Sequence, residues 1–217
     1  DELGELAMDF NQMAENLQKS SALRERLLRE QVERERLQES LETVRLLQQS
    51  LLPQGNIDDH PALEVAAAFR PMETVGGDYY DYLWFRDDGL GLVIGDDSGH
   101  GMSAGLLMVM AKSCLINQVR TSPGIQDVMA AINNMILESF QTKRIMTFQY
   151  AVFTPDGSRM RFASAGHQFP YIFRVEDESL EELESISYPL GVRHAMTLDT
   201  REVTLVPGDS VILFTDG

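Results

Sequence analysis

The sequence predicts an α+β domain with antiparallel sheets, preceded by a long N-terminal helix. Residues 1–52 contain one glycine and no proline, which favours an uninterrupted helix. From residue 63 onward, short apolar runs alternate with turn residues, a pattern typical of strands joined by hairpins. Two helical stretches lie together between strand pairs instead of alternating with single strands, so we expect antiparallel sheets.

The N-terminal helix carries two apolar runs with alternating spacings of three and four, the a/d pattern of a coiled coil. They are Leu3, Leu6, Phe10, Met13 and Leu17, then Leu37, Leu41, Val44, Gln48 and Leu51, with an interruption at Ser20, Ser21, Glu30 and Arg34. We therefore expect a parallel homodimer through residues 1–52. A solvated helical spacer is the alternative. Pro53 ends the helix, and a connector follows.

The globular part is predicted from turn signals and apolar runs. Strands are expected at 63–69, 81–85, 90–94, 148–153, 159–164, 171–175, 198–206 and 210–215, and helices at 103–118 and 125–140. Arg86–Gly89 and Pro155-Asp156-Gly157 each mark a hairpin turn.

The amino-acid composition argues against several classes of function. The 34 acidic and 18 basic residues give a net charge of -16, which argues against non-specific nucleic-acid binding and against docking on an anionic membrane. The single cysteine, Cys114, excludes an internal disulfide and is expected in the core. No apolar stretch approaches the ~20 residues that span a bilayer. The first residues read as part of a longer protein, so we expect a cytoplasmic domain, with any membrane anchor upstream of it.

Three acidic clusters lie beside glycines at strand ends: Asp78, Asp96-Asp97 and Asp216. Each alone is compatible with a plain turn. Carboxylates that converge at the edge of a core repel one another unless a cation lies between them. Oxygen ligands favour Mg²⁺, Mn²⁺ or Ca²⁺ over zinc. The four histidines, including His100 and His167, lie far apart and show no zinc-binding spacing.

Five motifs in order carry a resemblance to a known family: VGGDYYDY, VIGDDSGHGMSAGLLM, FASAGHQFPYIF, YPLGV and VILFTDG. Residues 45–217 resemble the metal-dependent serine/threonine protein phosphatase (PPM) family, in its RsbU/SpoIIE-like bacterial branch. DELGELAMDFNQMAENL is similar to the second helix of a HAMP signalling module. The resemblance implies a HAMP-like end at 1–19, a coiled-coil linker at 20–52, a connector at 53–62 and a phosphatase domain at 63–217 that lacks its C-terminal end.

The resemblance also implies an antiparallel β-sandwich flanked by helices that binds two Mn²⁺ or Mg²⁺ ions. Asp96 matches the carboxylate that bridges the two metals, Asp97 falls where a backbone carbonyl completes a shell, and Asp78 and Asp216 match further ligands. The family's last aspartate ligand falls beyond Gly217. A phosphate-binding arginine has a candidate match in Arg70.

The implied reaction is attack by a metal-activated water on the phosphorus of phosphoserine or phosphothreonine. His100 is a candidate general acid, with a turn residue as the alternative, and His167 is expected to hydrogen-bond within a turn. The implied substrate is a phosphorylated regulatory protein, of the anti-sigma-factor-antagonist (STAS) type, and control is expected through the dimeric helix. A non-catalytic dimeric signalling scaffold is the alternative. A nuclease or nucleotide hydrolase would need a basic groove or a phosphate-binding loop with lysine, and neither is present.

Overall fold

The computed structural model describes residues 2–57, 60–70, 75–85, 89–99, 101–140 and 143–216, with the side chains of its first helix described from Asn11 onward. The chain divides into two compact units, Asp1–Thr43 and Val44–Gly217, and each is described by itself. This division falls inside the first helix. The finer domain scheme expected from the sequence stays a prediction.

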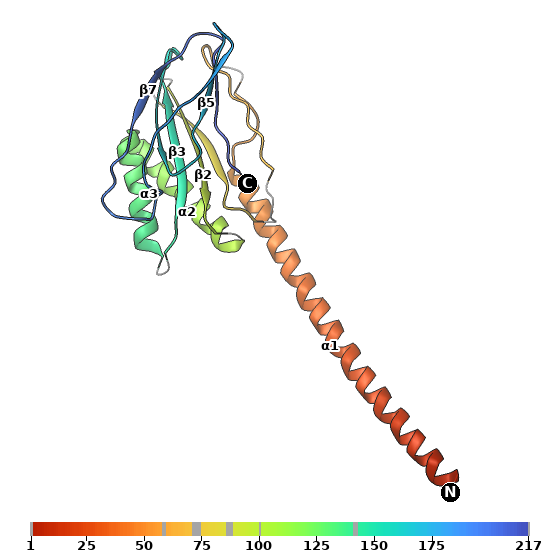
Figure 1. The fold of residues 1–217 in the computed structure, drawn as a ribbon. Coiled ribbons are helices and arrows are strands. Elements are labelled where there is room, and N and C mark those ends of the chain that lie inside the picture. The colour runs from red at the N-terminus through yellow and green to blue at the C-terminus, as the bar shows by residue number, and fades with distance from the viewer. Residues whose placement is uncertain are drawn as a thin grey trace. The chain divides into compact units, whose positions relative to one another are not determined.

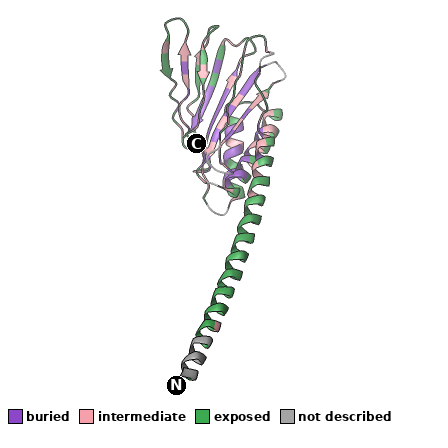
Figure 2. Cartoon of the chain, turned by 90° about the vertical axis from the view of Figure 1, so that its right-hand side faces the viewer, coloured by how far each residue is buried: buried purple, intermediate pink, exposed green. Residues whose placement is uncertain are grey.

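Helix α1 (Glu2–Leu51) is continuous and ends two residues before Pro53, as predicted. In the first unit its described side chains are almost all exposed (Figure 2). The apolar residues are exposed too, among them Leu17 at 63% and Leu27 at 55%. The earlier seam residues Leu3, Leu6 and Phe10 lie outside the described side chains. This unit therefore has no hydrophobic core of its own among the side chains that are described.

The last turns of α1 belong to the second unit and are buried there. Gln48 is 4% exposed, and its Nε2 donates to the carbonyl oxygen of Gly76 at 2.7 Å. Leu52, just after the helix, joins the main core. The expectation that Gln48 faces a partner helix was wrong, because an a/d spacing identifies a buried face without saying what covers it.

Two antiparallel sheets form the second unit (Figure 1). The five-stranded sheet has the order β1-β2-β3-β4-β7, and the three-stranded sheet has the order β6-β5-β8. Their strands are β1 (Tyr79–Trp84), β2 (Leu90–Asp97), β3 (Met146–Phe153), β4 (Arg159–Ala165), β5 (Tyr171–Arg174), β6 (Ser179–Glu182), β7 (Arg201–Thr204) and β8 (Ser210–Ile212). The predicted antiparallel α+β class is confirmed.

Helices α2 (Met102–Thr121) and α3 (Ile125–Ser139) cover one face of the five-stranded sheet (Figure 1). The main core lies between these helices and that sheet, and a second core lies on the sheet's other face. Tyr79, Leu107, Met129, Phe148 and Tyr150 are fully buried in the first, and Phe162 and Leu90 in the second. The order of layers is thus helices, five strands, then three strands.

Helix α2, of 20 residues, is long and apolar enough to cross a membrane by length and composition, with a mean hydropathy of 1.3 over an 18-residue window. The expectation that no segment would reach this length was therefore wrong. Six of its residues, including Leu107 and Leu115, are buried against the sheet and α3. Cys114 packs against the same core, and burial raises the pKa of its thiol. The apolar composition of α2 thus serves the core.

Three strand predictions differ from the structure. The segment 63–69 makes only one bridge, from Val65 to Ile57, and its three alanines are exposed. Strands β7 and β8 are shorter than expected, and β6 was not predicted because its acidic residues have low strand propensity. The two predicted hairpins, β1–β2 and β3–β4, are both present. Residues 86–88 of the first turn lie outside the described part of the chain.

Candidate metal centre

The loop before β1 lies directly against the end of β2, and glycine makes this possible. A Cβ atom on Gly77 would lie 2.9 Å from Asp96 Oδ1 and 2.9 Å from Asp97 Cβ. Any larger residue would push the loop away. The N–H of Gly101 also donates to the carbonyl oxygen of Val75 at 3.1 Å. The glycine before Asp78 therefore brings this aspartate next to Asp96.

Asp96 lies near the end of β2, opposite Thr147 of β3. Burial and the negative charges of Asp78, Asp216 and Asp97 raise the pKa of its carboxyl group to about 6. Asp78 and Asp216 come from segments far from Asp96 in the sequence, before β1 and after β8. The fold therefore brings Asp78 and Asp216 close enough to oppose the ionisation of Asp96.

Asp78 is desolvated in the same way. Burial raises the pKa of its carboxyl group, a hydrogen bond from Thr215 lowers it, and the charge of Asp216 raises it. Its Oδ1 atom is buried and has no hydrogen-bond partner. A buried carboxylate oxygen without a partner is costly, which indicates that a cation or water completes its surroundings.

Asp97 differs from Asp96 because its carboxylate is paired with the guanidinium of Arg144. The side chain of Asp97 is 1% exposed, and its Oδ2 accepts from Arg144 Nη1 at 3.4 Å. Burial raises the pKa of its carboxyl group, while Arg144 and the N–H of Gly99 lower it. The Oδ1 atom of Asp97 is buried without a partner. Sequence reasoning missed Arg144, because it precedes β3 and lies in none of the five motifs.

The predictions for His100, Arg70 and His167 differ in how far the structure tests them. His100 lies outside the described residues, so its role as general acid stays a prediction. Arg70 is exposed along a cleft whose lining also includes Asp78. His167 was expected to hydrogen-bond within a turn. Only its carbonyl oxygen does so, accepting from Ser164 Oγ at 2.9 Å, while its ring reaches other segments.

The donor set fits a hard divalent cation. Within the described part of the chain, no three His, Cys, Asp or Glu side chains are close enough to hold one ion together. The mutual repulsion of Asp78, Asp96 and Asp216 and the two unpartnered oxygens nevertheless show a negative, desolvated pocket. Carboxylate oxygens are the ligands that Mg²⁺ and Mn²⁺ prefer. The role of these residues as ligands stays a proposal.

Two later motifs pack against each other and against the segment that carries Arg144. Gly166 has a φ of +67°, and a Cβ there would lie 2.3 Å from Pro189 Cγ. Gly191, with a φ of +83°, packs so closely that a Cβ would lie 2.2 Å from the Arg144 carbonyl oxygen. These contacts require glycine for both conformation and space. The AGH and YPLGV motifs therefore support the segment that carries Arg144.

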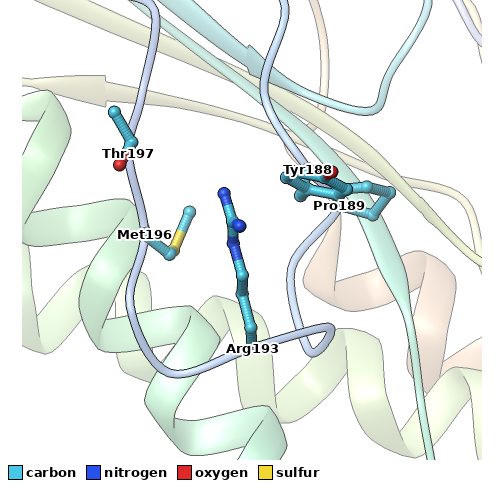
Figure 3. Close-up of a pocket in the computed structure, with 5 residues that line it drawn as sticks. All are labelled: Tyr188, Pro189, Arg193, Met196 and Thr197. Carbon is cyan, nitrogen blue, oxygen red and sulfur yellow. The ribbon is translucent and has the colours of Figure 1, made fainter.

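A separate small hollow in the YPLGV loop is lined by Tyr188, Pro189, Arg193, Met196 and Thr197 (Figure 3). The Arg193 guanidinium lies 4.1 Å from the centre of the Tyr188 ring. Asn133 of α3 holds this loop, since its side chain bonds the N–H of Gly191 and the carbonyl oxygen of Arg193. None of the acidic site residues lines this hollow.

Solved structures of other proteins share the fold of this chain. The SiaA-PP2C domain of Pseudomonas aeruginosa superposes with a TM-score of 0.67 at 18% identity, covering 82% of this chain and 71% of that one. RsbX in complex with magnesium superposes with a TM-score of 0.52 at 14% identity, covering 71% of this chain and 68% of RsbX. At these identities the likeness shows the fold alone. That fold is the layered architecture of PPM-type (PP2C) phosphatase domains.

Within this class the sequence comparison is more specific. The profile of the family Stage II sporulation protein E (SpoIIE) matches residues 86–217, and the chain belongs to this family. The phosphoserine phosphatase RsbU of Bacillus subtilis is 25% identical over 181 residues, which are 83% of this chain and 53% of RsbU. The chain thus spans about half the length of this relative. The HAMP-like part of the resemblance stays a prediction.

Proposed function

We propose that this chain is the regulated catalytic part of a Mg²⁺- or Mn²⁺-dependent phosphoserine/phosphothreonine protein phosphatase. Its substrate is a phosphorylated regulatory protein of the anti-sigma-factor-antagonist (STAS) type. The single observation that carries the proposal is the convergence of Asp78, Asp96 and Asp216 from three distant segments, with the pKa of Asp96 raised to about 6 by burial and by the other two charges. Membership of the SpoIIE family supports it.

Each residue of the site would have a separate role in holding the metal ions. Asp78, Asp96 and Asp216 would hold the cations, and the main chain at Asp97 would contribute a further oxygen. The Arg144 guanidinium holds the Asp97 side chain at 3.4 Å. When bound, the cations would supply a nucleophilic water at neutral pH and offset charge on the transferred phosphoryl group. RsbX, which shares the fold, has been solved with magnesium.

The net charge of -16 is also relevant to the substrate. A phosphoprotein is anionic, so the field of an acidic chain opposes its approach. Bound divalent cations invert that field locally. We therefore propose that substrate affinity, and not only the chemical step, depends on the metals.

The decisive experiment compares Asp96→Asn with the wild-type protein. Phosphate release from a phosphoserine-containing STAS protein is measured with Mn²⁺, with Mg²⁺ and with a chelator. Wild type is expected to require a divalent cation, and Asp96→Asn to lose at least ~100-fold in rate, about 3 kcal/mol of transition-state stabilisation. Asp177→Asn is the matched control because Asp177 lies in the exposed β5–β6 turn.

Two results would contradict the proposal. Equal rates for wild type and Asp96→Asn would remove the metal site from the reaction. Absence of cation-dependent release by the wild-type protein, with retained self-association, would favour the alternative of a non-catalytic scaffold.

The proposed control passes through α1. We propose that residues 1–43 pair with a second copy, because exposed apolar residues such as Leu17 and Leu27 have no cover within the first unit. In the second unit the helix reaches the metal-binding loop directly, through Gln48 and Gly76. A change in helix pairing can thus bias the position of Asp78. The placement of the domain in the cytoplasm, with any membrane anchor upstream, belongs to the same proposal.

A further inference from the structure

His167 makes two side-chain hydrogen bonds, one to a residue opposite a proposed metal ligand and one to the segment that carries another. Its ring is 5% exposed, with Nδ1 2.9 Å from Thr147 Oγ1 and Nε2 3.1 Å from the carbonyl oxygen of Phe214. Thr147 lies opposite Asp96 in the β2–β3 register. Phe214 lies two residues before Asp216.

The two partners fix the tautomer of the ring. A carbonyl oxygen can only accept a hydrogen bond, so Nε2 must carry the proton. Burial lowers the pKa of His167 to about 4, although the Phe214 carbonyl and the charge of Asp216 raise it. The ring is therefore neutral at pH 7, and Nδ1 accepts from the Thr147 hydroxyl. That hydroxyl has one hydrogen, so its longer contact of 3.3 Å to the Asp96 carbonyl is secondary.

The segment that carries Asp216 lies outside the strand ladders, although Thr215 hydrogen-bonds Asp78. Strand β8 ends at Ile212, and residues 213–216 have no strand partner in the part of the chain that is described. The Phe214 ring stacks on Tyr171 with 5.8 Å between centres. The His167 bond to the Phe214 main chain therefore links the three-stranded sheet, where β8 lies, to the β2–β3 pair of the other sheet, where Asp96 lies.

We propose that His167, as the neutral Nε2–H tautomer, is a positioning residue that sets the spacing of Asp96 and Asp216 and thereby the affinity for divalent cations. The inference rests on the proposed function, because it assigns these aspartates to a metal site. His167 touches no reacting atom. It acts through its bond to the Phe214 main chain, while Thr147 orients the ring. Outer residues that orient metal ligands typically change metal affinity 10–100-fold when they are replaced.

Two amide substitutions separate the two bonds. The amide nitrogen of His167→Gln reaches the position of Nε2 and can still donate to Phe214. The amide of His167→Asn reaches only the position of Nδ1, so it keeps the contact with Thr147 and loses the bond to Phe214. Both variants lose the ring, so a general loss of packing affects both.

The test uses Mn²⁺ binding to the metal-free 217-residue chain by titration calorimetry. We expect His167→Asn to weaken binding at least ~10-fold and His167→Gln to stay within ~3-fold of wild type. A second readout needs no metal. In ¹⁵N-histidine-labelled protein, the signal that His167→Gln removes should report the Nε2–H tautomer.

The outcomes separate this inference from the proposed function. An Nδ1–H tautomer, or equal Mn²⁺ affinity for His167→Asn and wild type, overturns the inference and leaves the phosphatase proposal in place. Equal loss in both variants also overturns it, because the bond to Phe214 would then not be the cause. A wild-type protein that binds no Mn²⁺ and releases no phosphate overturns both.

Discussion

Residues 11–43 of α1 and the domain that follows use the same residue types under opposite conditions. In α1 the charges are exposed and paired along the helix, as in Arg29–Glu25 at 2.5 Å, and its leucines are exposed. In the domain Leu107 and Leu115 of α2 are buried, and the carboxylates of Asp78 and Asp96 are desolvated next to one another. Ion pairs between neighbouring turns stabilise the first region. Burial stabilises the second region and offsets the electrostatic repulsion within its acidic site.

The largest expected effect tests the burial of α2. Leu107→Ala should destabilise the protein by about 2–5 kcal/mol, because Leu107 is fully buried in the main core. Its neighbour Leu106 is 56% exposed, so Leu106→Ala should cost under about 0.5 kcal/mol. Urea unfolding measures both. An equal cost for the two would mean that another chain covers the outer face of α2.

The next effect tests whether α1 is covered by a second copy. Leu17→Asp would place a charge in the proposed seam and should raise the dimer dissociation constant at least ~10-fold, about 1.4 kcal/mol. Gln18→Asp adds the same charge outside the seam and is the control. Sedimentation at micromolar concentration measures both. A monomeric wild type would exclude the pairing, and α1 would then be a solvated spacer.

The acidic pocket gives a smaller effect with a defined sign. The pKa of Asp96 is raised from 3.8 to about 6, so the metal-free folded protein holds this proton more tightly than the unfolded chain does. Its stability should fall as pH rises from about 4 to above 6. Asp96→Asn removes this loss of stability and should stabilise the metal-free protein at pH 7.5 by about 1 kcal/mol, after allowance for solvent screening at a partly exposed group.

Thermal unfolding of the metal-free protein at pH 4 and pH 7.5 checks this sign. The stabilising effect should disappear at pH 4, and Asp177→Asn should not show it. Saturating Mn²⁺ should reverse the order at pH 7.5, because wild type alone would retain the full ligand set. A less stable metal-free Asp96→Asn at pH 7.5 would contradict the electrostatic account of the pocket.

The smallest effect concerns the exposed ion pairs. Arg29→Gln removes the contact with Glu25 and should cost the helix about 0.3–0.5 kcal/mol. Amide hydrogen exchange in that turn should accelerate about twofold at low salt, with little difference in 1 M NaCl. Gln38→Ala, on the same exposed helix, keeps all charges and is the control. A change of tenfold or more would mean that the pair is shielded from solvent.

Local pattern was enough to predict most elements of this protein. The spacing of apolar residues identifies α1, α2 and α3, and turn residues identify the two hairpins, because these signals depend on neighbours in sequence. The acidic clusters beside glycines at strand ends indicate a site, since a carboxylate there lies at the edge of the core. The segment 63–69 shows the limit of such signals, because its apolar run has no ladder partner in the described part of the chain.

Contacts between residues far apart in the sequence depend on the tertiary structure. The spacing that places Gln48 on a buried face does not say that Gly76 covers it. Nothing near Arg144 in the sequence predicts its contact with Asp97, and nothing near His167 predicts its bond to Phe214, 47 positions away. The sequence alone determined that Asp78, Asp96 and Asp216 are candidates for one site. Only the fold brings Asp78 and Asp216 close enough to raise the pKa of Asp96, because electrostatic coupling depends on distance in space and on burial, and neither is set locally.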